Sequence, residues 1–438
     1  MANIENIVVI GGGLMGSSAA WQLAKCGQKV LLLEQQSRKY RNGSSYGDAR
    51  ITRMLGPKKD LFSYVQQTTV AEVKTLIRFL NGLSIKPSHR MKDIYTTSPV
   101  SYFFQRDQQA QVDLFRHKRQ KKKYRTASGD AAFRKFGVTI SDDEILVRER
   151  DKYSGTFNPK VLIKKLHAGI KQKESVIKYD HRVKRIVRKN GVFEIKVTNR
   201  KGGKKKTILA RQVVVAVGAY TSQLLQQEAP YFKKLITPKR VPLFFFRIRK
   251  KRYSRLTKVE KRSIFDAHPV FAQNDKMYFS MIEQRSKKGK SPLFKVGGHK
   301  IRRNIVDLDR IWQQQPPRRE MKWAKKKFRK YLEALEIYVD KKDIELVESR
   351  NCVYSMTKSE IPFVTPILTK DRHLDTNMIV MGGMSGVGAK GCLAYGLIGT
   401  DWLLGRSENS KIYQKTRKEL GNPTLRLNVK KRKPHRLF

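Results

Sequence analysis

The chain has 438 residues, and its 94 Lys and Arg outnumber its 37 Asp and Glu to give a formal net charge of +57. Because 39% of the residues are hydrophobic, the composition excludes a wholly disordered chain, which would combine high net charge with few apolar residues. No fixed repeat is present, which excludes collagen and solenoids. The three cysteines, Cys26, Cys352 and Cys392, are too few for a disulfide framework or a zinc site, so we expect a folded protein in a reducing compartment, with no metal.

The first 34 residues predict a strand-helix-strand unit. A short β-branched run at residues 6–10 predicts the first strand, and residues 14–26 are compatible with a helix. Residues 28–34 predict a second strand, which ends in a carboxylate. This order is typical of the opening of a nucleotide-binding α/β domain.

Glycines between the first strand and the helix match the G-x-G-x-x-G pattern of dinucleotide-binding proteins. Gly11 permits the tight turn, Gly13 lets backbone N–H groups approach a pyrophosphate, and Gly16 allows the helix to pack closely on the strand. Glu34 follows Gly16 by 18 residues, where its carboxylate can accept the ribose hydroxyls. The motif predicts FAD or NAD binding and does not by itself distinguish them.

Helices are predicted at residues 60–83 and 159–174, the second with Pro159 at a first helical position. Short alternating runs predict antiparallel strands with a hairpin turn at residues 201–203; these runs are residues 176–179, 181–187, 192–197 and 207–209. A buried strand is predicted at residues 213–217, closed by Gly218. This strand favours FAD over NAD, because a flavoprotein needs such a strand beside the ribityl chain and the flavin.

The pattern changes between about residues 230 and 345 and then returns to apolar runs. Aromatic-rich strands and a basic helix are predicted there, at residues 243–248, 276–281, 293–296 and 318–335. A strand at residues 377–381 and a helix from Gly388 to Leu404 follow. We therefore predict an α/β, two-domain protein in which a discontinuous Rossmann-like FAD-binding domain carries an inserted, mostly antiparallel-sheet substrate domain.

The predicted boundaries divide the chain into six segments. The FAD-binding domain takes residues 1–90, 151–230 and 346–420, and the substrate domain takes residues 91–150 and 231–345. Residues 421–438 form a basic C-terminal tail.

Most of the positive charge lies in clusters outside the predicted nucleotide-binding motifs. These clusters include residues 116–125, 201–206, 325–330 and 430–436. A basic surface attracts polyanions such as nucleic acids, but no specific nucleic-acid-binding motif accompanies it. A general surface excess of Lys and Arg is the favoured interpretation, and nonspecific polyanion binding stays open.

No targeting or membrane-spanning segment is evident in the sequence. Residues 1–5 lack a positive n-region, and the most apolar later stretch, residues 241–246, is too short for a membrane span. Residues 435–438 lack a clear peroxisomal ending. We expect a soluble, cytoplasmic protein.

Four further motifs make the chain resemble the monomeric sarcosine oxidase family of FAD-dependent amine oxidases, which includes N-methyltryptophan, pipecolate and fructosyl amino acid oxidases. The motifs are NGSSYGDARITR at residues 42–53, KVGGH at 295–299, NCVYSMT at 351–357 and GMSGVGAK at 383–390. With the glycine motif, their order and approximate spacing match the family over roughly residues 5–405. The resemblance implies a monomer that uses FAD and O2 and produces hydrogen peroxide.

The resemblance also implies how FAD is held. Cys352 matches the cysteine that forms a thioether to the flavin 8α-methyl carbon, whereas Cys26 and Cys392 match no such position and are interpreted as structural thiols. The expected FAD-binding residues are Gly11, Gly13, Met15, Gly16, Glu34, Ser44, Arg50, Val183, Gly218, Cys352, Gly383, Gly386, Gly388 and Lys390.

Five residues take catalytic or substrate-binding roles by the same resemblance. Arg53 and Lys390 match the pair of cations that holds the substrate carboxylate, for which an arginine fork and a lysine at a helix start are suited. Lys295 matches the lysine that activates O2, where a positive charge stabilises developing negative charge. Arg50 matches a residue beside the flavin ring, and His299 matches an active-site histidine.

Two departures from the family pattern bear on the substrate. Val387 replaces a family histidine, and Phe279, near Met281, replaces a pocket tyrosine, which leaves an apolar wall. Sarcosine is therefore disfavoured relative to a bulkier secondary or N-methyl amino acid, or an α-amino acid with an apolar side chain.

The predicted activity is removal of a hydride from the carbon next to the nitrogen of an amino acid, after which the imine hydrolyses. Two alternatives stay open. One is a flavin-dependent dehydrogenase that uses another electron acceptor, and the other is a catalytically silent flavoprotein that binds polyanions.

Overall fold

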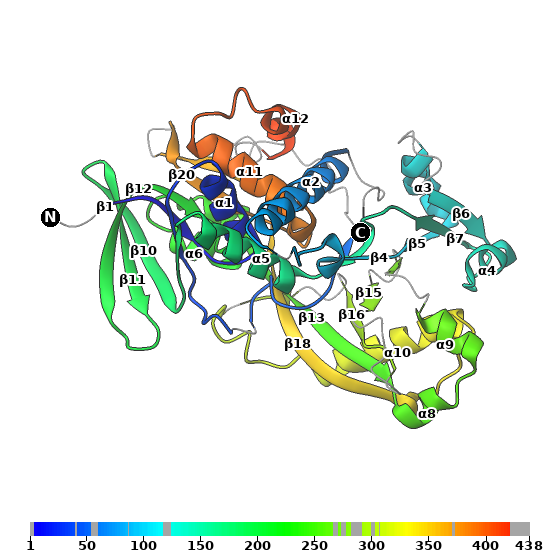
Figure 1. Cartoon of the computed structure of the whole chain (residues 1–438). Coiled ribbons are helices and arrows are strands. Elements are labelled where there is room, and N and C mark those ends of the chain that lie inside the picture. Colours follow the sequence, from blue (N-terminus) through cyan, green and yellow to red (C-terminus); the bar gives the residue numbers. More distant parts are fainter. Residues whose placement is uncertain are drawn as a thin grey trace.

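A large mixed sheet, eight-stranded in the described residues, forms the first layer of the computed structural model (Figure 1). The structure describes residues 4–39, 42–53, 60–85, 87–116, 124–265, 270–272, 277–281, 291–298, 303–305, 307–369 and 373–420. The strand order is β10-β11-β12-β1-β2-β9, with β20 paired to β12 and β19 paired to β20. The strands are β1 (Ile4–Ile10), β2 (Val30–Leu33), β9 (Val176–Lys178), β10 (His181–Lys189), β11 (Val192–Asn199), β12 (Lys205–Val215), β19 (Phe363–Leu368) and β20 (Leu374–Gly382).

The centre of this sheet is parallel and buried on both faces. Strand β1 pairs in parallel with β2 and β12, and β12 pairs in parallel with β20. All four residues of β2 are buried, as expected for a parallel strand that reads as a continuous apolar run. The predicted strand-helix-strand opening is confirmed.

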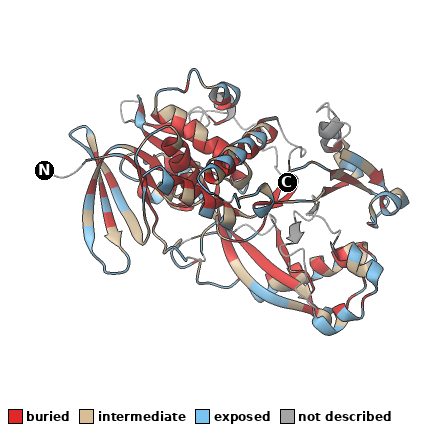
Figure 2. Ribbon diagram, in the orientation of Figure 1, coloured by how far each residue is buried: buried red, intermediate tan, exposed pale blue. Residues whose placement is uncertain are grey.

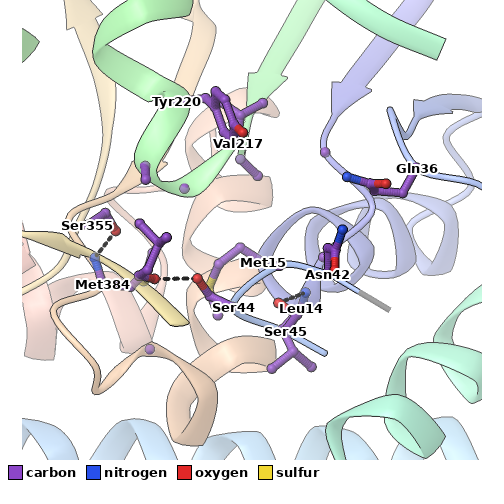
Figure 3. Close-up of a pocket in the computed structure, with 18 of the residues that line it drawn as sticks. Leu14, Met15, Gln36, Asn42, Ser44, Ser45, Val217, Tyr220, Ser355 and Met384 are labelled. Carbon is purple, nitrogen blue, oxygen red and sulfur yellow. Dashed lines mark hydrogen bonds between the residues drawn. The ribbon is translucent and has the colours of Figure 1, made fainter. Parts of the chain in front are cut away.

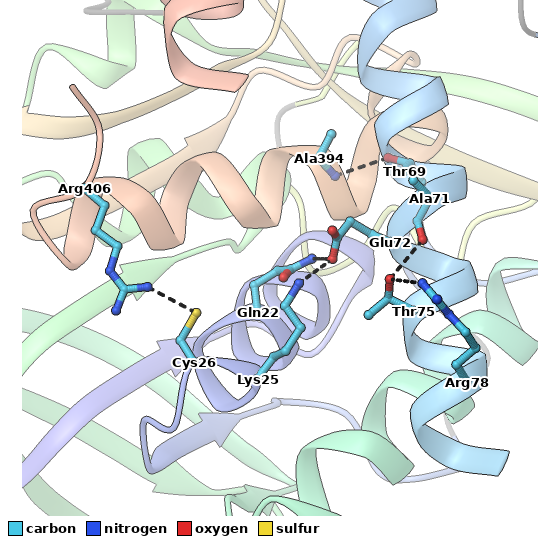
Figure 4. Close-up of polar contacts among 10 residues, drawn as sticks. All are labelled: Gln22, Lys25, Cys26, Thr69, Ala71, Glu72, Thr75, Arg78, Ala394 and Arg406. Atoms are coloured by element: carbon cyan, nitrogen blue, oxygen red, sulfur yellow. Dashed lines mark hydrogen bonds and ion pairs between the residues drawn. The ribbon is translucent and has the colours of Figure 1, made fainter. Parts of the chain in front are cut away.

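Four helices pack on one another beside this sheet, as the buried faces in Figure 2 show. They are α1 (Leu14–Lys25), α2 (Asp60–Gly82), α5 (Pro159–Gln172) and α11 (Cys392–Leu403). Helix α5 begins as predicted, because Asn158 accepts a hydrogen bond from the N–H of Val161 and Pro159 occupies the first turn. Glu72 on α2 accepts hydrogen bonds from Gln22 and Lys25 at 2.7 and 2.6 Å and ties α2 to α1 (Figure 4).

A second sheet, nine-stranded in the part of the chain that the structure describes, is antiparallel except for one strand pair. Its order is β17-β13-β16-β15-β14-β5-β7-β6, with β18 paired to β13. The strands are β5 (Val100–Gln105), β6 (Tyr124–Ser128), β7 (Glu144–Glu149), β13 (Thr237–Ile248), β14 (Val270–Ala272), β15 (Met277–Met281), β16 (Phe294–Gly298), β17 (Arg303–Asn304) and β18 (Ile344–Met356). A small third sheet holds β3 (Arg50–Thr52), β8 (Gly155–Phe157) and β4 (Tyr95–Thr97).

The basic helix α10 (Arg318–Ala334) covers the second sheet with its apolar stripe. The Phe328 ring stacks on Phe246 and packs against Phe294, with ring centroids 5.7 and 5.1 Å apart. The remaining α-helices are α3 (Gln109–Arg116), α4 (Asp130–Phe136), α6 (Thr221–Leu224), α7 (Phe232–Leu235), α8 (Lys250–Ser254), α9 (Lys258–Phe265) and α12 (Lys411–Leu420). Short 3-10 turns are η1 (Met91–Asp93), η2 (Arg106–Gln108), η4 (Gly218–Tyr220), η5 (Lys341–Asp343) and η6 (Gly388–Gly391).

The predicted fold class is confirmed, and the strands differ from the prediction in two details. Strand β9 is not antiparallel to its neighbour but pairs in parallel with β2. The strands predicted separately at residues 207–209 and 213–217 form one continuous strand, β12, because no glycine or proline interrupts residues 205–215.

The segment boundaries of the two domains stay predictions. The segment 346–420, assigned to the FAD-binding domain, contains most of β18, which pairs with β13 in the second sheet. Within the described ranges, no helix has both the length and the apolar character of a membrane span.

Candidate functional site

An elongated cavity lies at the carboxyl ends of the parallel strands and extends to the second sheet. It begins at Ile10 and Leu33, the last residues of β1 and β2, and reaches Lys295 on β16 and Cys352 on β18. Figure 3 shows part of its wall, where Met15, Ser44 and Val217 surround the space from different elements. The carboxyl edge of an open parallel sheet is where α/β proteins bind nucleotides.

The glycine motif forms one end of this cavity. Gly11 has a φ of +103°, and a Cβ there would lie 2.6 Å from the carbonyl oxygen of Ala216. The backbone N–H of Leu14, at the start of α1, donates to the Ser45 hydroxyl at 3.0 Å (Figure 3). The turn thus brings the backbone close to the cavity at a helix N-terminus, the kind of position at which α/β proteins bind a pyrophosphate.

Substitution of Gly16 by alanine is expected to destabilise the protein by about 1–3 kcal/mol or more. The added Cβ would lie 1.8 Å from the carbonyl oxygen of Gly11, so helix α1 would have to move away from β1. Urea denaturation measures the change in the free energy of unfolding. Gly202→Ala is the control, since a Cβ there meets nothing within 4 Å; equal stability of the two variants would contradict the packing role of Gly16.

Glu34 lies in the same end of the cavity as a nearly buried carboxylate. Its Oε2 accepts a hydrogen bond from the N–H of Gly12 at 2.6 Å, and its Oε1 accepts one from the N–H of Gln36 at 2.7 Å. Burial raises the pKa of Glu34, and these backbone donors oppose the rise. The carboxylate is thus fixed beside the glycine turn, and the loop, the carboxylate and the elongated cavity together fit FAD.

Most of the predicted FAD-binding residues line the cavity. They are Gly11, Gly13, Met15, Glu34, Ser44, Arg50, Val183, Gly218, Cys352, Gly386, Gly388 and Lys390. Gly16 and Gly383 do not line it in the described part of the chain. Gly16 allows α1 to pack on β1, and Gly383 has a φ of +65° with its Cβ position against Thr357, so both have supporting positions.

Cys352 is a buried, unpaired thiol on the cavity wall. Its strand is held from both sides, because the Ser44 hydroxyl donates to the carbonyl of Val353 and Arg240 donates to Asn351 Oδ1 at 3.1 Å. Arg240 in turn forms a buried ion pair with Glu320. These contacts fix the position of the thiol.

Lys295 and Arg50 bring two cations to the part of the cavity wall near the second sheet. The Lys295 Nζ donates to the carbonyl of Ala49 at 2.5 Å, and Arg50 donates to the carbonyls of Ala49, Ser44 and Tyr46 at 2.9, 2.8 and 2.7 Å. Burial lowers the pKa of Lys295 well below its usual value, and Arg50 and then Arg350 lower it further. Such a cluster of cations favours negative charge in the adjoining space.

Lys390 and Arg53 lie close together, but only Lys390 is among the described residues that line the cavity. Lys390 lies in η6, just before α11, and lines the cavity. Burial and then the charge of Arg53 lower the pKa of Lys390 well below its usual value. Arg53 is 4% exposed, lies with its Cζ 5.6 Å from the centre of the Tyr102 ring, and is not among the described residues that line the cavity.

The structure gives less information on three other predicted site residues, Val387, Phe279 and His299. Val387 is buried and does not line the cavity in the described part of the chain. Phe279 lies in β15 with its backbone opposite Val296, but its side chain lies outside what the structure describes, as does the whole of His299. Their roles stay predictions.

Several cavity residues carried no role in the sequence analysis. Tyr220 lines the wall (Figure 3), and its hydroxyl donates to the carbonyl of Leu308 at 3.0 Å, while burial raises its pKa to about 12. Ser355 accepts a hydrogen bond from the N–H of Met384 at 3.1 Å and so joins β18 to the second glycine-rich loop (Figure 3). Ser45 and Ser355 lie within motifs quoted above, and Tyr220 lies just after the predicted strand at residues 213–217, whereas Trp312, which also lines the cavity, gave no sequence signal.

Comparison with known proteins gives matches in sequence. A family model described as FAD dependent oxidoreductase matches residues 6–402. A probable sarcosine oxidase from Arabidopsis thaliana is 48% identical over 64 residues, which are 15% of this chain and 15% of that protein. Monomeric sarcosine oxidase from Bacillus sp. (strain B-0618) is 46% identical over 53 residues, 12% of this chain and 14% of that protein. The alignments thus span only a small part of these relatives.

Solved structures match along nearly the whole chain. The amino acid oxidase NikD in its open form has a TM-score of 0.70 and 18% identity over 95% of this chain and 97% of that chain. L-proline dehydrogenase from P. horikoshii has a TM-score of 0.67 and 17% identity over 96% of this chain and 100% of that chain. At this identity the likeness shows a shared fold.

Proposed function

Because the chain belongs to the family of FAD-dependent oxidoreductases, we propose that it is an oxidase of a secondary, N-methyl or other α-amino acid. The observation that carries the proposal is a pair of neighbouring cations, here called the carboxylate clamp: the half-buried Lys390 lines the cavity, and the buried Arg53 lies beside it. Two neighbouring cations repel each other and attract an anion, and a substrate carboxylate that enters the cavity at Lys390 suits this positive charge.

FAD bound in the cavity supplies the chemistry, because it accepts the hydride of the substrate and its electrons pass on to O2. The N-terminus of α1 and the glycine turn would hold the pyrophosphate, and Glu34 would accept the ribose hydroxyls. Cys352 would bind the flavin covalently through its thiol.

The clamp would orient the substrate. Lys390 would hold the substrate carboxylate, with Arg53 behind Lys390, and the neighbouring C–H bond would then lie in the cavity. The binding energy of the carboxylate, which is remote from the reacting carbon, would thus orient that carbon. The nearby cations disfavour a protonated substrate amine, and the neutral amine is the form that can lose a hydride. Overall, amino acid, O2 and water give an oxo acid or aldehyde, an amine and hydrogen peroxide.

We place the enzyme in the cytoplasm as a monomer. Support comes from the three cysteines, which are all unpaired in the structure as in a reducing compartment. Size-exclusion chromatography with light scattering tests the monomer.

A screen of amino acids with the wild type and Lys390→Met tests the proposed function. We expect peroxide formation in air with at least one N-methyl, cyclic or apolar α-amino acid and none with the matching carboxamide. Loss of a buried, charge-assisted contact costs about 2–5 kcal/mol, so KM for that substrate should rise at least about 30-fold in the variant. Lys358→Met, at an exposed lysine, is the control and should leave KM unchanged. Equal turnover of acid and carboxamide would contradict the clamp.

A further inference from the structure

Glu149, the last residue of β7, is a fully buried carboxylate outside the cavity wall. Its Oε2 accepts a hydrogen bond from the Tyr102 hydroxyl at 3.0 Å, and its Oε1 accepts one from the Ser154 hydroxyl at 2.6 Å. Two neutral donors alone do not offset the cost of a buried charge. A buried carboxylate in this setting therefore points to positive charge nearby.

Arg53 and Lys390, the two residues of the carboxylate clamp, supply this positive charge. The Arg53 guanidinium lies over the ring of Tyr102, whose hydroxyl binds Glu149. The charge of Glu149 raises the pKa of Lys390, against the stronger lowering by burial and by Arg53. The three charges come from segments far apart in the chain, at the end of β3, the end of β7 and η6.

We propose that Glu149 is a positioning residue of the carboxylate clamp, whose negative charge keeps Lys390 charged and holds Tyr102 beside Arg53. This role rests on the proposed function, in which the clamp binds the substrate carboxylate. With Glu149 present, the two cations carry one net positive charge, and a single carboxylate neutralises it. Without Glu149, two like charges would face each other in a buried site, and Lys390 would lose its proton more easily.

The other titratable groups beside Lys390 stay neutral over the range in which it titrates. Burial raises the pKa of Tyr102 on β5 and raises that of Cys392, at the start of α11, to about 12. Helix α2 presents Val65 to the turn that carries Lys390. Among the described residues, the charge of Arg53 lowers the pKa of Lys390 and the charge of Glu149 raises it.

The test measures binding of acetate and benzoate, which have no amine that titrates. Their Kd is followed through the visible spectrum of the FAD-loaded enzyme, from about pH 6 to about pH 10, where a lysine with a lowered pKa loses its proton. In the wild type we expect binding to weaken as Lys390 deprotonates. In Glu149→Gln, which keeps the shape of the side chain, the same weakening should begin at least about one pH unit lower, so that Kd is about tenfold higher than in the wild type at intermediate pH.

Matched variants separate charge from structure. Glu144→Gln, on the same strand but bonded to Ser141, should keep the wild-type pH profile, and Tyr102→Phe should keep it too, because the charge of Glu149 remains. If Glu149→Gln does not fold, Arg53→Met gives a second test and should move the weakening to higher pH.

Two outcomes would overturn the proposal in different ways. A change in Kd by the same factor at every pH in Glu149→Gln would show a merely structural role for Glu149 and leave the clamp intact. A wild-type enzyme that binds neither carboxylate at any pH would remove the clamp itself, and with it the proposed function.

Discussion

Replacement of Cys352 by alanine is expected to release all of the FAD when the protein is precipitated with acid, whereas the wild type should keep its yellow colour in the pellet. Among the three cysteines, Cys352 alone lines the described cavity. Its position is set by the pairing of β18 with β13, in which Cys352 lies opposite Val241. The effect is all-or-none, because a thioether survives unfolding and noncovalent binding does not.

The two other cysteines provide the controls. Cys392 is buried in α11, and burial raises its pKa to about 12, which makes it a poor nucleophile. Cys26 contacts Arg406 at 3.6 Å, away from the cavity (Figure 4). Cys26→Ala and Cys392→Ala should both retain the colour in the pellet. Colour that stays with the Cys352→Ala pellet, or that leaves the wild-type pellet, would contradict the covalent link.

Replacement of Lys295 by methionine is expected to slow the reaction of the reduced enzyme with O2 by about 10²–10³-fold, the usual effect of removing one preorganised electrostatic group. Lys295 is buried, lines the cavity and is held by the carbonyl of Ala49. Anaerobic reduction by the amino acid should change only a few-fold, because the carboxylate clamp is intact. Stopped-flow spectroscopy measures the two half-reactions separately.

A lysine at the other end of the cavity serves as the control for this prediction. Lys184 also lines the cavity but is exposed on β10, and Lys184→Met should leave the reaction with O2 unchanged. Equal slowing of both half-reactions in Lys295→Met would contradict the assigned role. A wild type that reacts slowly with O2 but rapidly with another acceptor would favour the alternative of a dehydrogenase.

The sequence predicted those parts of the fold whose signals are local. The opening strand, the glycine turn and helix α1 follow from a short run of residues in which each position has a steric or hydrogen-bonding requirement. The start of α5 was equally clear, because Pro159 suits the first turn of a helix. Strand partners were harder, and β9 pairs in parallel with β2 because of contacts between segments far apart in the chain.

The candidate site shows the same division. Motifs placed Glu34, Lys295, Cys352 and Lys390 around one cavity, because each lies in a distinctive local pattern. Glu149 had no such pattern, since its burial depends on Tyr102 and Ser154 from other segments. The motif that contains Arg53 did not predict that Arg53 lies behind the described cavity wall and not on it.

Anaerobic mixing of the purified protein with the best amino acid of the screen tests the central claim most directly. We expect the visible flavin absorbance to bleach fully at one equivalent of substrate per FAD and to return on admission of air, with one equivalent of hydrogen peroxide. Absorbance that every amino acid in the screen leaves unchanged, although dithionite bleaches it, would contradict an amino acid oxidase.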